Sequence, residues 1–392
     1  MLFIHKKKNL SRLNSLLSFL LLQQYRLVNL PIYIFAKKWF QPLKQQNIVK
    51  ILLLRQGGIG DTVVALPAIN AIRNHFPGAE IHLLTHHVIG DTVSVPDLLP
   101  VNFFRKIFKY KKFVDEDILR QLKHEKYDLF IELPSDKASL YFELRSVWLA
   151  KRIGVKYGIG WQVSSTTFLK KQQEKLLYFE NEQNRLLKIL SKYIPGLVIN
   201  GQHTAQLSFP AEKEQSINFN QNTKKQLALA FSAGEAKKIW PLNNFTALAN
   251  YFSNKGFEIL LIGGQSDKTA ADEICRNVKQ AVNLCGNLNI HQTAAALRNC
   301  HLLISNDTGA IHLAYSVGTA VIGIYSGKDY SNRWFPPESP YNKVLRNASV
   351  PCIICYKQKC ANNICMQNIT VDEVIKQSEA LLQQIEATDS AT

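Results

Sequence analysis

The sequence predicts an α/β protein made of two consecutive domains, each with an open parallel sheet. Short apolar segments alternate with longer segments of helical spacing, and loops rich in glycine or proline separate them. This alternation occurs twice, on either side of the polar, irregular segment 196–222, which is our candidate linker. Open α/β domains bind ligands at the carboxyl ends of their strands, so we expect a cleft between the two domains.

In the first half, the largely apolar segment 48–54 predicts the first strand, and loop 56–60 follows it. A helix is expected at 61–75, and 80–84 begins the next strand. Strand-helix-strand spacing of this kind indicates parallel pairing. Further along we expect a strand at 127–133, a helix at 137–152 and a turn-rich return at 153–160.

The second half repeats the alternation. The expected strands are 226–231, 257–262, 301–304 and 321–325, and the expected helices are 242–255, 268–278 and 291–299. After the strand at 301–304, segment 305–314 continues into a further helix, with Asp307 or Thr308 at its N-cap. Free amides and the dipole at such a helix start favour phosphate, although a helix cap and a turn at Gly309 would produce the same pattern of residues.

The chain is strongly basic, with 47 Lys and Arg residues against 30 Asp and Glu residues, a net charge of +17. The first fifty residues contain nine basic residues and no acidic one. Within them, the apolar runs 16–22 and 30–36 are shorter than the roughly 20 residues that cross a bilayer. This basic, amphipathic region favours attachment to an anionic cytoplasmic membrane surface, and a packed helix with a solvated basic face is the alternative.

A secretory signal and a nucleic-acid-binding segment are both less consistent with this basic N-terminal region. A secretory signal would need a small-residue cleavage site, and none follows the apolar run before Gln23-Gln24, so we expect the segment to be retained. Nucleic-acid binding lacks any accompanying finger, RNP or helix-turn-helix signature, so we expect no nucleic-acid partner.

With 392 residues, 46% of them hydrophobic, the chain is long enough for two domains. We expect a basic N-terminal extension at 1–47, a first α/β domain at 48–210 and a second at 211–392.

Four of the seven cysteines cluster in the sequence, as Cys352, Cys355, Cys360 and Cys365. The first pair has the spacing of zinc ligands, but the second pair is too widely spaced for a standard zinc ribbon. A structural zinc and free or paired thiols are both compatible with this pattern. The other three cysteines stand singly and are expected to be buried in a reducing compartment.

Glycines Gly57, Gly58 and Gly60 follow the first expected strand, where a backbone turns tightly or approaches a ligand. A dinucleotide fingerprint would need a third glycine further on and an acid at the end of the second strand, so nicotinamide binding is disfavoured. Asp61 comes next, at the carboxyl edge of the strand, and could act as a general base. It could also be the helix N-cap, which would lower its pKa and weaken it as a base.

In the second domain, three strand-end loops contain groups that suit a diphosphate. One has Ser232, Gly234 and the two lysines before Trp240-Pro241, with Pro241 expected at the first helical position. The others are the loop that begins at Gly263 and segment 305–314. Amides, hydroxyls and a cation from neighbouring loops would meet at one edge of the sheet.

Taken in order, these residues resemble family nine glycosyltransferases, the lipopolysaccharide heptosyltransferase family, from about Ile48 to the last helix. The matching motifs are Ile51 to Arg55 with Gly60-Asp61 and Leu66-Pro67-Ala68, then Lys238-x-Trp240-Pro241, then Ser305 to Gly309 with His312-Leu313-Ala314. Tyr325 to Asp329 and the run Pro351-Cys352-x2-Cys355-Tyr356-Lys357 are also similar.

The resemblance implies a GT-B fold with two facing Rossmann-like domains, an acceptor domain at 48–210 and a donor domain at 211–392. It also implies inversion at the anomeric carbon, and neither a catalytic metal nor a cofactor. It implies that Asp61 is the base that activates the acceptor hydroxyl, and that Gly60 belongs to the acceptor side. On the donor side, Lys238 would bind the pyrophosphate, together with Ser232, Gly234 and Gly263, and Asp307 would contact the sugar. Thr308 and Gly309 would hold phosphate oxygens, and His312 would lie one helical turn further along the same face.

The chain departs from the family pattern at several positions. Ser232-Ala233-Gly234 replaces a hydroxyl pair, Ser326-Gly327-Lys328 replaces a Gly-Pro-Thr string, and Asp267 stands where glutamate is more usual. The stretch 103–112 is basic and aromatic, and Arg105 and Lys106 within it are our candidate contacts to an anionic lipid-linked saccharide. A plain solvated helix face is the alternative for this stretch.

The sequence therefore favours an inverting glycosyltransferase, attached to the cytoplasmic face of the inner membrane, that moves heptose from ADP-heptose to a lipopolysaccharide-type acceptor. No residue pattern in it identifies the base or the sugar directly, so another nucleotide sugar is the first alternative. A nicotinamide-dependent oxidoreductase and a noncatalytic membrane scaffold are the alternatives from other classes.

Overall fold

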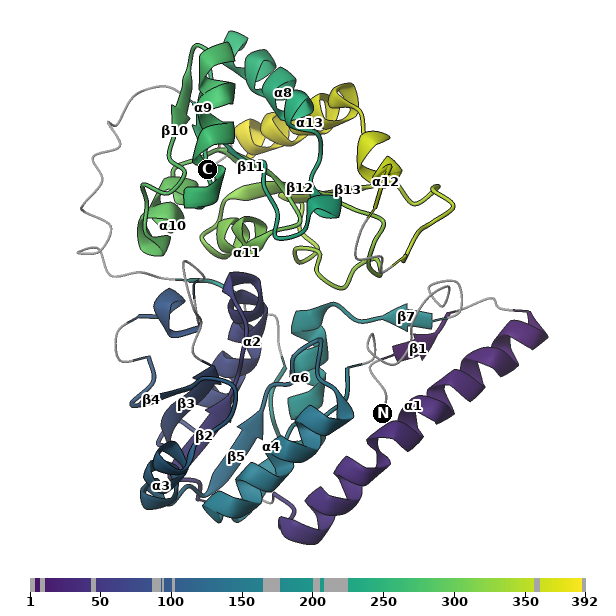
Figure 1. The fold of residues 1–392 in the computed structure, drawn as a ribbon, viewed down its shortest axis with the longest axis vertical. Helices are drawn as coiled ribbons and strands as arrows, with labels where there is room; N and C mark the ends of the chain where they lie inside the picture. The colour runs from purple at the N-terminus through teal and green to yellow at the C-terminus, as the bar shows by residue number, and fades with distance from the viewer. Residues whose placement is uncertain are drawn as a thin grey trace. The chain divides into compact units, whose positions relative to one another are not determined.

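The computed structural model describes residues 4–7, 11–43, 47–86, 93, 95–100, 103–164, 177–199, 205–207, 225–355 and 360–389. The chain divides into two compact units, Met1–Ala205 and Gln206–Thr392, which are drawn in Figure 1. Most of the expected linker 196–222, and the expected boundary between 210 and 211, lie outside the described residues.

The first unit is built on a parallel sheet of five strands in the order β4-β3-β2-β5-β6. These strands are β2 (Lys50–Leu54), β3 (Glu80–His86), β4 (Ile107–Tyr110), β5 (Leu129–Glu132) and β6 (Tyr157–Ile159). Its helices are α1 (Arg12–Trp39), α2 (Ile59–His75), α3 (Glu116–Glu125), α4 (Leu140–Ile153) and α6 (Glu182–Tyr193), with a short 3-10 turn at Val95–Leu98. A separate antiparallel pair joins β1 (Ile4–Lys6) to β7 (Leu177–Phe179).

Two short strands of this unit were not predicted from the sequence. Stretch 103–112 contains strand β4, paired with β3, where the alternative expected a helix face. Its residues alternate, with Phe108 and Tyr110 buried and their neighbours exposed, which is the two-residue period of a strand. The expected turn-rich return contains β6, which pairs with β5 and lies between two glycines of positive φ, Gly154 at 82° and Gly160 at 104°.

The N-terminal helix α1 packs against α4, as Figure 1 shows. One face is buried at Ser18, Tyr25 and Ile32, which are seven residues apart, and the Tyr25 hydroxyl donates to the Val163 carbonyl. The opposite face exposes a run of large apolar side chains, including Leu13, Leu16, Leu17, Leu20, Leu27, Leu30 and Ile34. No helix in the described ranges is both long and apolar enough to cross a membrane.

The second unit has a parallel sheet of six strands in the order β10-β9-β8-β11-β12-β13. The strands are β8 (Gln226–Ala230), β9 (Glu258–Leu261), β10 (Ala281–Asn283), β11 (Leu302–Asn306), β12 (Ala320–Tyr325) and β13 (Asn342–Arg346). The helices are α8 (Leu242–Asn254), α9 (Lys268–Asn277), α10 (Ile290–Arg298), α11 (Gly309–Ser316), α12 (Ile364–Gln367) and α13 (Val371–Asp389), with 3-10 turns at Ala236–Lys238 and Gln265–Asp267.

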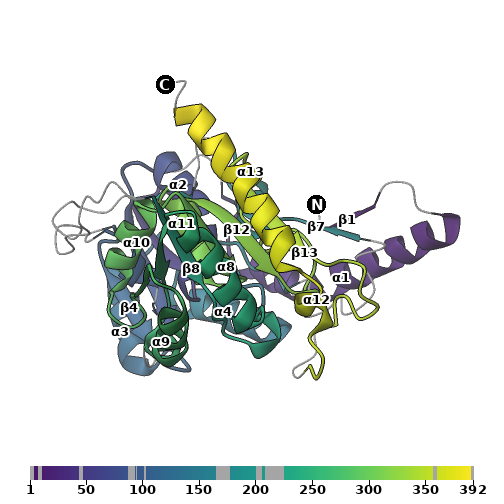
Figure 2. The ribbon, with the colours of Figure 1, turned by 90° about the horizontal axis from the view of Figure 1, so that it is seen from above.

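The core of this unit lies between its sheet and the helices that cover it. Trp240 is fully buried, its indole N–H donates to the Ile369 carbonyl at 2.8 Å, and its ring meets Phe245 edge-on. Figure 2 shows α13 lying alongside α8, two helices that are also in contact. Pro241, expected at the first helical position, is instead the N-cap of α8, with an extended ψ of 135°.

Candidate functional site

In the second unit, the loops that follow β8, β9 and β11 lie at one edge of the sheet. These three strands are parallel neighbours, so their carboxyl ends meet. The Ser232 hydroxyl donates to Asp267 Oδ2 at 2.9 Å, and the Gly264 amide donates to the same oxygen at 2.8 Å. A Cβ at Gly263 would come within 2.6 Å of that oxygen, so this position has no room for a larger side chain. The convergence predicted for these loops is therefore present in the fold.

Asn306 at the end of β11 connects two of these loops. It is fully buried, its Oδ1 accepts from the Trp240 amide at 3.0 Å, and its Nδ2 donates to the Phe231 carbonyl at 2.6 Å. The motif that contains Asn306 was noted in the sequence, but no role was given to this residue. A buried amide at the end of an otherwise apolar strand was the available signal, because such a group needs partners.

Lys238 and Asp307 form an ion pair, with Nζ and Oδ2 2.6 Å apart. Burial lowers the pKa of Lys238, but the pair with Asp307 outweighs it, so the pKa is raised and the ammonium stays charged. We expected the two residues to contact different ligand groups, pyrophosphate for Lys238 and sugar for Asp307, and did not predict their contact with each other. Side-chain exposures of 21% and 13% leave both groups partly accessible.

Helix α11 starts at this edge, with Thr308 as its N-cap. The Thr308 hydroxyl accepts from the Ala310 amide at 3.2 Å and lies 3.3 Å from the Ser305 hydroxyl. Gly309 is the first residue of the helix. The N-cap predicted at Asp307 or Thr308 is thus at Thr308, directly after Asp307 of the ion pair.

His312 is buried, and its Nδ1 lies 3.1 Å from the Tyr315 hydroxyl. Burial, helped by the positive charge of Lys238, lowers its pKa to about 4, so the imidazole is neutral at pH 7. The ring also meets Trp334 edge-on. These contacts make His312 a packing group beneath the loop in this structure.

Glu235 lies at the centre of a second cluster of charged side chains, which the sequence did not predict. Its carboxylate pairs with Lys237 at 2.7 Å and with Lys328 at 2.5 Å. Burial raises the pKa of Glu235, but the two lysines overcome this and hold it at about 2. Gly234 beside it is exposed, and a Cβ there would meet no atom within 4 Å.

In the first unit, α2 begins at Ile59, so Gly58 is the N-cap and Asp61 is the third helical residue. The alternative in which Asp61 is the N-cap is wrong, although its Oδ2 still accepts from the Gly58 amide at 3.2 Å. The lowered pKa that this alternative implied is not found either. Burial raises the pKa of Asp61, with Arg55 opposing and Asp136 adding to the shift.

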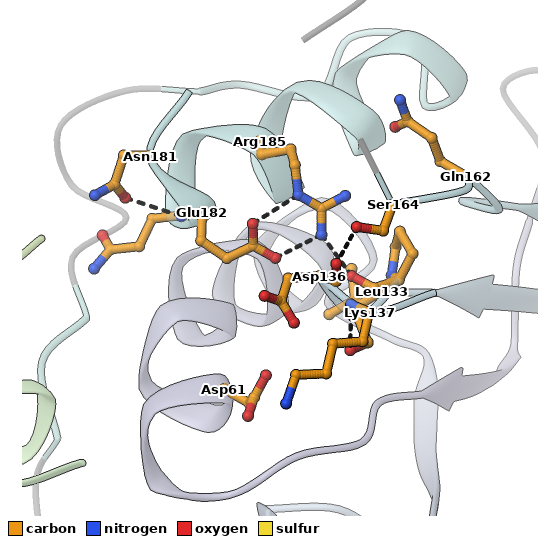
Figure 3. Close-up of polar contacts among 12 residues, drawn as sticks. Asp61, Leu133, Asp136, Lys137, Gln162, Ser164, Asn181, Glu182 and Arg185 are labelled. Carbon is orange, nitrogen blue, oxygen red and sulfur yellow. Dashed lines mark hydrogen bonds and ion pairs between the residues drawn. The ribbon is translucent and has the colours of Figure 1, made fainter. Parts of the chain in front are cut away.

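The groups around Asp61 come from distant parts of the first unit. The Arg55 guanidinium is fully buried, lies 3.4 Å from Asp61 Oδ1 and donates to the Asp61 carbonyl at 2.7 Å. Figure 3 shows Asp61 facing Asp136 and Lys137 from the loop after β5, with the Glu182–Arg185 ion pair of α6 close by. We had assigned no role to these four neighbours from the sequence, because their proximity depends on the pairing of β2 with β5 and the packing of α6.

Gly60 lies beside Asp61 in the first turn of α2. Arg105 and Lys106, the other two candidate acceptor residues, do not lie beside Asp61. They immediately precede β4, at the amino edge of the sheet, whereas Asp61 follows the carboxyl edge of β2. Lys106 pairs with Glu125 there, and Arg105 is 77% exposed. The structure does not bring these two candidate acceptor residues to Asp61.

All seven cysteines are free thiols. Among the described residues, which include Cys352, Cys355, Cys360 and Cys365, no group of three or more His, Cys, Asp or Glu is arranged to hold a metal ion. The described residues of this cluster therefore form no zinc site. Burial raises the pKa of the Cys365 thiol, with the three other cysteines adding to the shift.

Each unit is a Rossmann-like α/β domain, and the chain is a two-domain protein of the GT-B class. The family model of glycosyltransferase family 9 (heptosyltransferase) matches residues 116–365. The chain belongs to this family.

Named relatives and solved structures agree with this assignment. Lipooligosaccharide heptosyltransferase 2 of Campylobacter jejuni is 26% identical over 349 residues, which cover 85% of this chain and 98% of the relative. A family 9 glycosyl transferase from Veillonella parvula has a TM-score of 0.65 at 17% identity, covering 88% of this chain and 100% of its own. Escherichia coli heptosyltransferase WaaC with ADP-2-deoxy-2-fluoro heptose has a TM-score of 0.57 at 16% identity, covering 85% and 99%.

Proposed function

We propose that this glycosyltransferase moves heptose from ADP-heptose to a lipopolysaccharide-type acceptor, with inversion at the anomeric carbon. Family membership supports the transfer reaction, and the names of the Campylobacter relative and the Escherichia coli structure support the acceptor and the donor. The observation that carries the proposal is the cluster of Lys238, Asp307 and the α11 N-terminus at one sheet edge. Neither the oxidoreductase nor the scaffold alternative is favoured, since the family is one of transferases.

The donor diphosphate would bind at the start of α11. Its oxygens would accept from the first amides of the helix and from the Thr308 hydroxyl, and the helix dipole would add to the attraction. Lys238 would turn from Asp307 toward the phosphate, which would free the Asp307 carboxylate to accept a hydrogen bond from a sugar hydroxyl. Ser232, Gly234 and Gly263 would line the neighbouring loops.

Asp61 would be the base. As the acceptor hydroxyl attacks the anomeric carbon, the oxygen–carbon bond forms, the bond to the diphosphate breaks, and the acceptor proton passes to the Asp61 carboxylate. The raised pKa of Asp61 improves it for this role, because a carboxylate that holds a proton more tightly is a stronger base. Gly60, beside it in the first turn of α2, would lie on the acceptor side.

We further propose that the reaction needs no metal and no cofactor. Positive charge from Lys238 and the amides of α11 would stabilise the leaving diphosphate, the role that a divalent cation has in many other transferases. Undiminished turnover after exhaustive chelation is the expected result, and loss of turnover that Mg²⁺ restores would contradict it.

The enzyme would work at the cytoplasmic face of the inner membrane, held there by α1. The helix exposes apolar side chains such as Leu16 (56%) and Leu27 (64%), and Lys37 and Lys38 lie in its last turn. An amphipathic helix with basic residues binds in the interface of an anionic bilayer. The partners we infer are therefore the nucleotide sugar, the lipid-linked saccharide and the membrane surface, without nucleic acid.

Calorimetry with ADP, UDP and NAD tests the donor assignment. We expect ADP to bind and the other two to bind at least tenfold more weakly, a difference of about 1.4 kcal/mol. Tighter binding of UDP would indicate another nucleotide sugar, and binding of NAD alone would indicate an oxidoreductase. No binding of any of the three would leave the scaffold alternative.

A further inference from the structure

A large apolar pocket lies in the first unit, where α1 crosses the edge of the sheet next to α6. Its volume is about 730 Å³. One wall comes from α1, a second from β6 and the residues after it, and a third from α6. All of the residues that line it belong to the first unit, and none of them is assigned to donor, acceptor or base.

The floor of the pocket is a stack of aromatic rings. Phe40 lies over Trp161 with ring centroids 5.2 Å apart, and Trp161 lies over Phe130 at 5.7 Å. A Cβ at Gly158 would approach the Trp161 ring to 2.5 Å and the Phe40 ring to 3.1 Å, so glycine is required for the rings to lie there. The floor is therefore rigid and apolar, which suits a hydrocarbon chain.

Three cations line the same pocket, and none of its described lining residues is acidic. Arg26 and Lys37 come from α1, and Lys192 comes from α6, where its ammonium lies over the Tyr193 ring at 4.9 Å. Arg26 donates to the Gln23 side chain, a neutral partner that does not offset its charge. Apolar walls with positive charge at their rim match a ligand with an acyl chain and an anionic head group.

The pocket also continues into the exposed apolar face of α1. Leu30 and Tyr33 line it, yet they remain 45% and 54% exposed. A lipid lying in the plane of the bilayer could thus enter the pocket sideways, with its chain leaving one apolar environment for another. For a short-chain lipid dissolved in water, each methylene that enters the pocket contributes roughly 0.8 kcal/mol, so a single chain would give a measurable affinity.

We propose that this pocket binds one anionic phospholipid of the membrane, with an acyl chain on the Phe40–Trp161 floor and the phosphate attracted by the cations that line the pocket, Lys37 and Lys192 among them. The site would bind a single lipid molecule specifically, in addition to the nonspecific attachment of α1 to the membrane surface. It rests on the proposed membrane attachment of α1 and is independent of the sugar that the enzyme transfers.

Native mass spectrometry of the full chain with dioctanoyl phosphatidylglycerol, kept below its micelle concentration, tests this site without a bilayer. We expect one lipid per chain, with phosphatidylcholine of the same chain length binding roughly tenfold more weakly. Lys37→Glu combined with Lys192→Glu should weaken the phosphatidylglycerol complex by roughly tenfold or more. Lys38→Glu is the matched control, since Lys38 is adjacent on α1 but does not line the pocket, and it should change binding by less than about twofold.

Filling the pocket provides a second variant. Ala36→Trp should abolish lipid binding, with its thermal melt compared with that of the original chain to confirm folding. Equal binding of the two lipids, equal weakening by Lys38→Glu, or a dimer that occupies the pocket in place of lipid would overturn the proposal.

Flotation on anionic vesicles separates this site from the attachment of α1. A chain that floats but binds no single lipid lacks this site, whereas a chain that does not float lacks the proposed attachment.

Discussion

Among single residues, Asp61 shows how surroundings change the chemistry of a side chain. It lies in the first turn of α2, where the helix dipole and the Gly58 amide favour a carboxylate. Its pKa is nevertheless raised, because burial outweighs these groups and Arg55. A prediction based on the helix start alone gives the wrong sign for the shift.

The raised pKa of Asp61 predicts where turnover is lost on the acid side of the pH profile. Because the base must be unprotonated, turnover should fall as the pH decreases through the pKa of Asp61, at a higher pH than an ordinary aspartate with a pKa near 3.9 would give. Measurement of kcat/KM against pH locates this loss of turnover. A profile that stays flat down to about pH 4 would contradict an enzyme that uses Asp61 in this way.

Lys238 gives a prediction for donor binding. Lys238→Ala should weaken ADP binding by about tenfold to a hundredfold, because it removes a charge-assisted hydrogen bond to phosphate. Calorimetry measures this, with Lys255→Ala as the control, since Lys255 follows α8 and pairs with Glu379 instead. Equal affinities of the two variants for ADP would exclude Lys238 from the diphosphate site.

The sequence predicted single residues well where the signal was local. Thr308 at the α11 N-cap is one example, because the residue types around a helix start are distinctive. Contacts between residues distant in the sequence were not predicted. The Lys238–Asp307 and Glu235–Lys328 pairs depend on which strands are neighbours, which the chain order does not reveal.

Among the helices and strands, the long strand-loop-helix units were predicted and the short edge strands were not. Strands β8, β9 and β11 have continuous apolar segments, because a parallel sheet covered on both faces needs them. Strand β4 has only four residues, two of them exposed, so the basic residues beside it dominated the interpretation. Strand β6 has three residues, with Gly158 at its centre.

The packing of α4 against β5 buries two carboxyl groups and predicts a pH effect on stability. Burial raises the pKa of Glu132 to about 7. Burial also raises the pKa of Glu143, and the negative charge of an ionised Glu132 raises it further. A raised carboxyl pKa favours the protonated form in the folded state. Its contribution is therefore fully present below the unfolded value near 4.3 and is lost as the pH rises through the folded value. The melting temperature should fall between about pH 5 and pH 8.

Glu132→Gln isolates this contribution. The amide can still accept from the Ser146 hydroxyl but carries no charge, so the variant should lose less of its melting temperature over that range. Glu116→Gln serves as the control, since that side chain is 73% exposed. An unchanged pH dependence in Glu132→Gln would mean that this carboxyl stays ionised in the folded protein.

For the molecule as a whole, the proposed membrane attachment combines the charge and the apolar exposure of the N-terminal region. The nine basic residues among the first fifty would attract an anionic surface, and the exposed face of α1 would supply the apolar contact. Flotation on anionic vesicles should weaken as salt rises from 0.1 M to 1 M, since the screening length falls from about 10 Å to about 3 Å. It should also weaken in the double variant Leu16→Ser and Leu20→Ser at either salt concentration.

Salt-independent flotation would contradict the electrostatic part of this attachment, and unchanged flotation of the double variant would contradict the apolar part. The sequence indicated both parts, because composition and spacing are local properties. It could not separate the exposed residues of α1, which we propose face the membrane, from those that pack on α4, since that division depends on how α1 lies against the domain.

Transfer of heptose from ADP-heptose can be measured by mass analysis of the acceptor. Lipopolysaccharide from a strain that lacks the protein would be incubated with ADP-heptose and either the original chain or Asp61→Asn. We expect the original chain to add the mass of one heptose, and the variant to be slower by at least about a hundredfold while still binding ADP. No added heptose with the original chain, or equal rates for the two proteins, would contradict the proposed function.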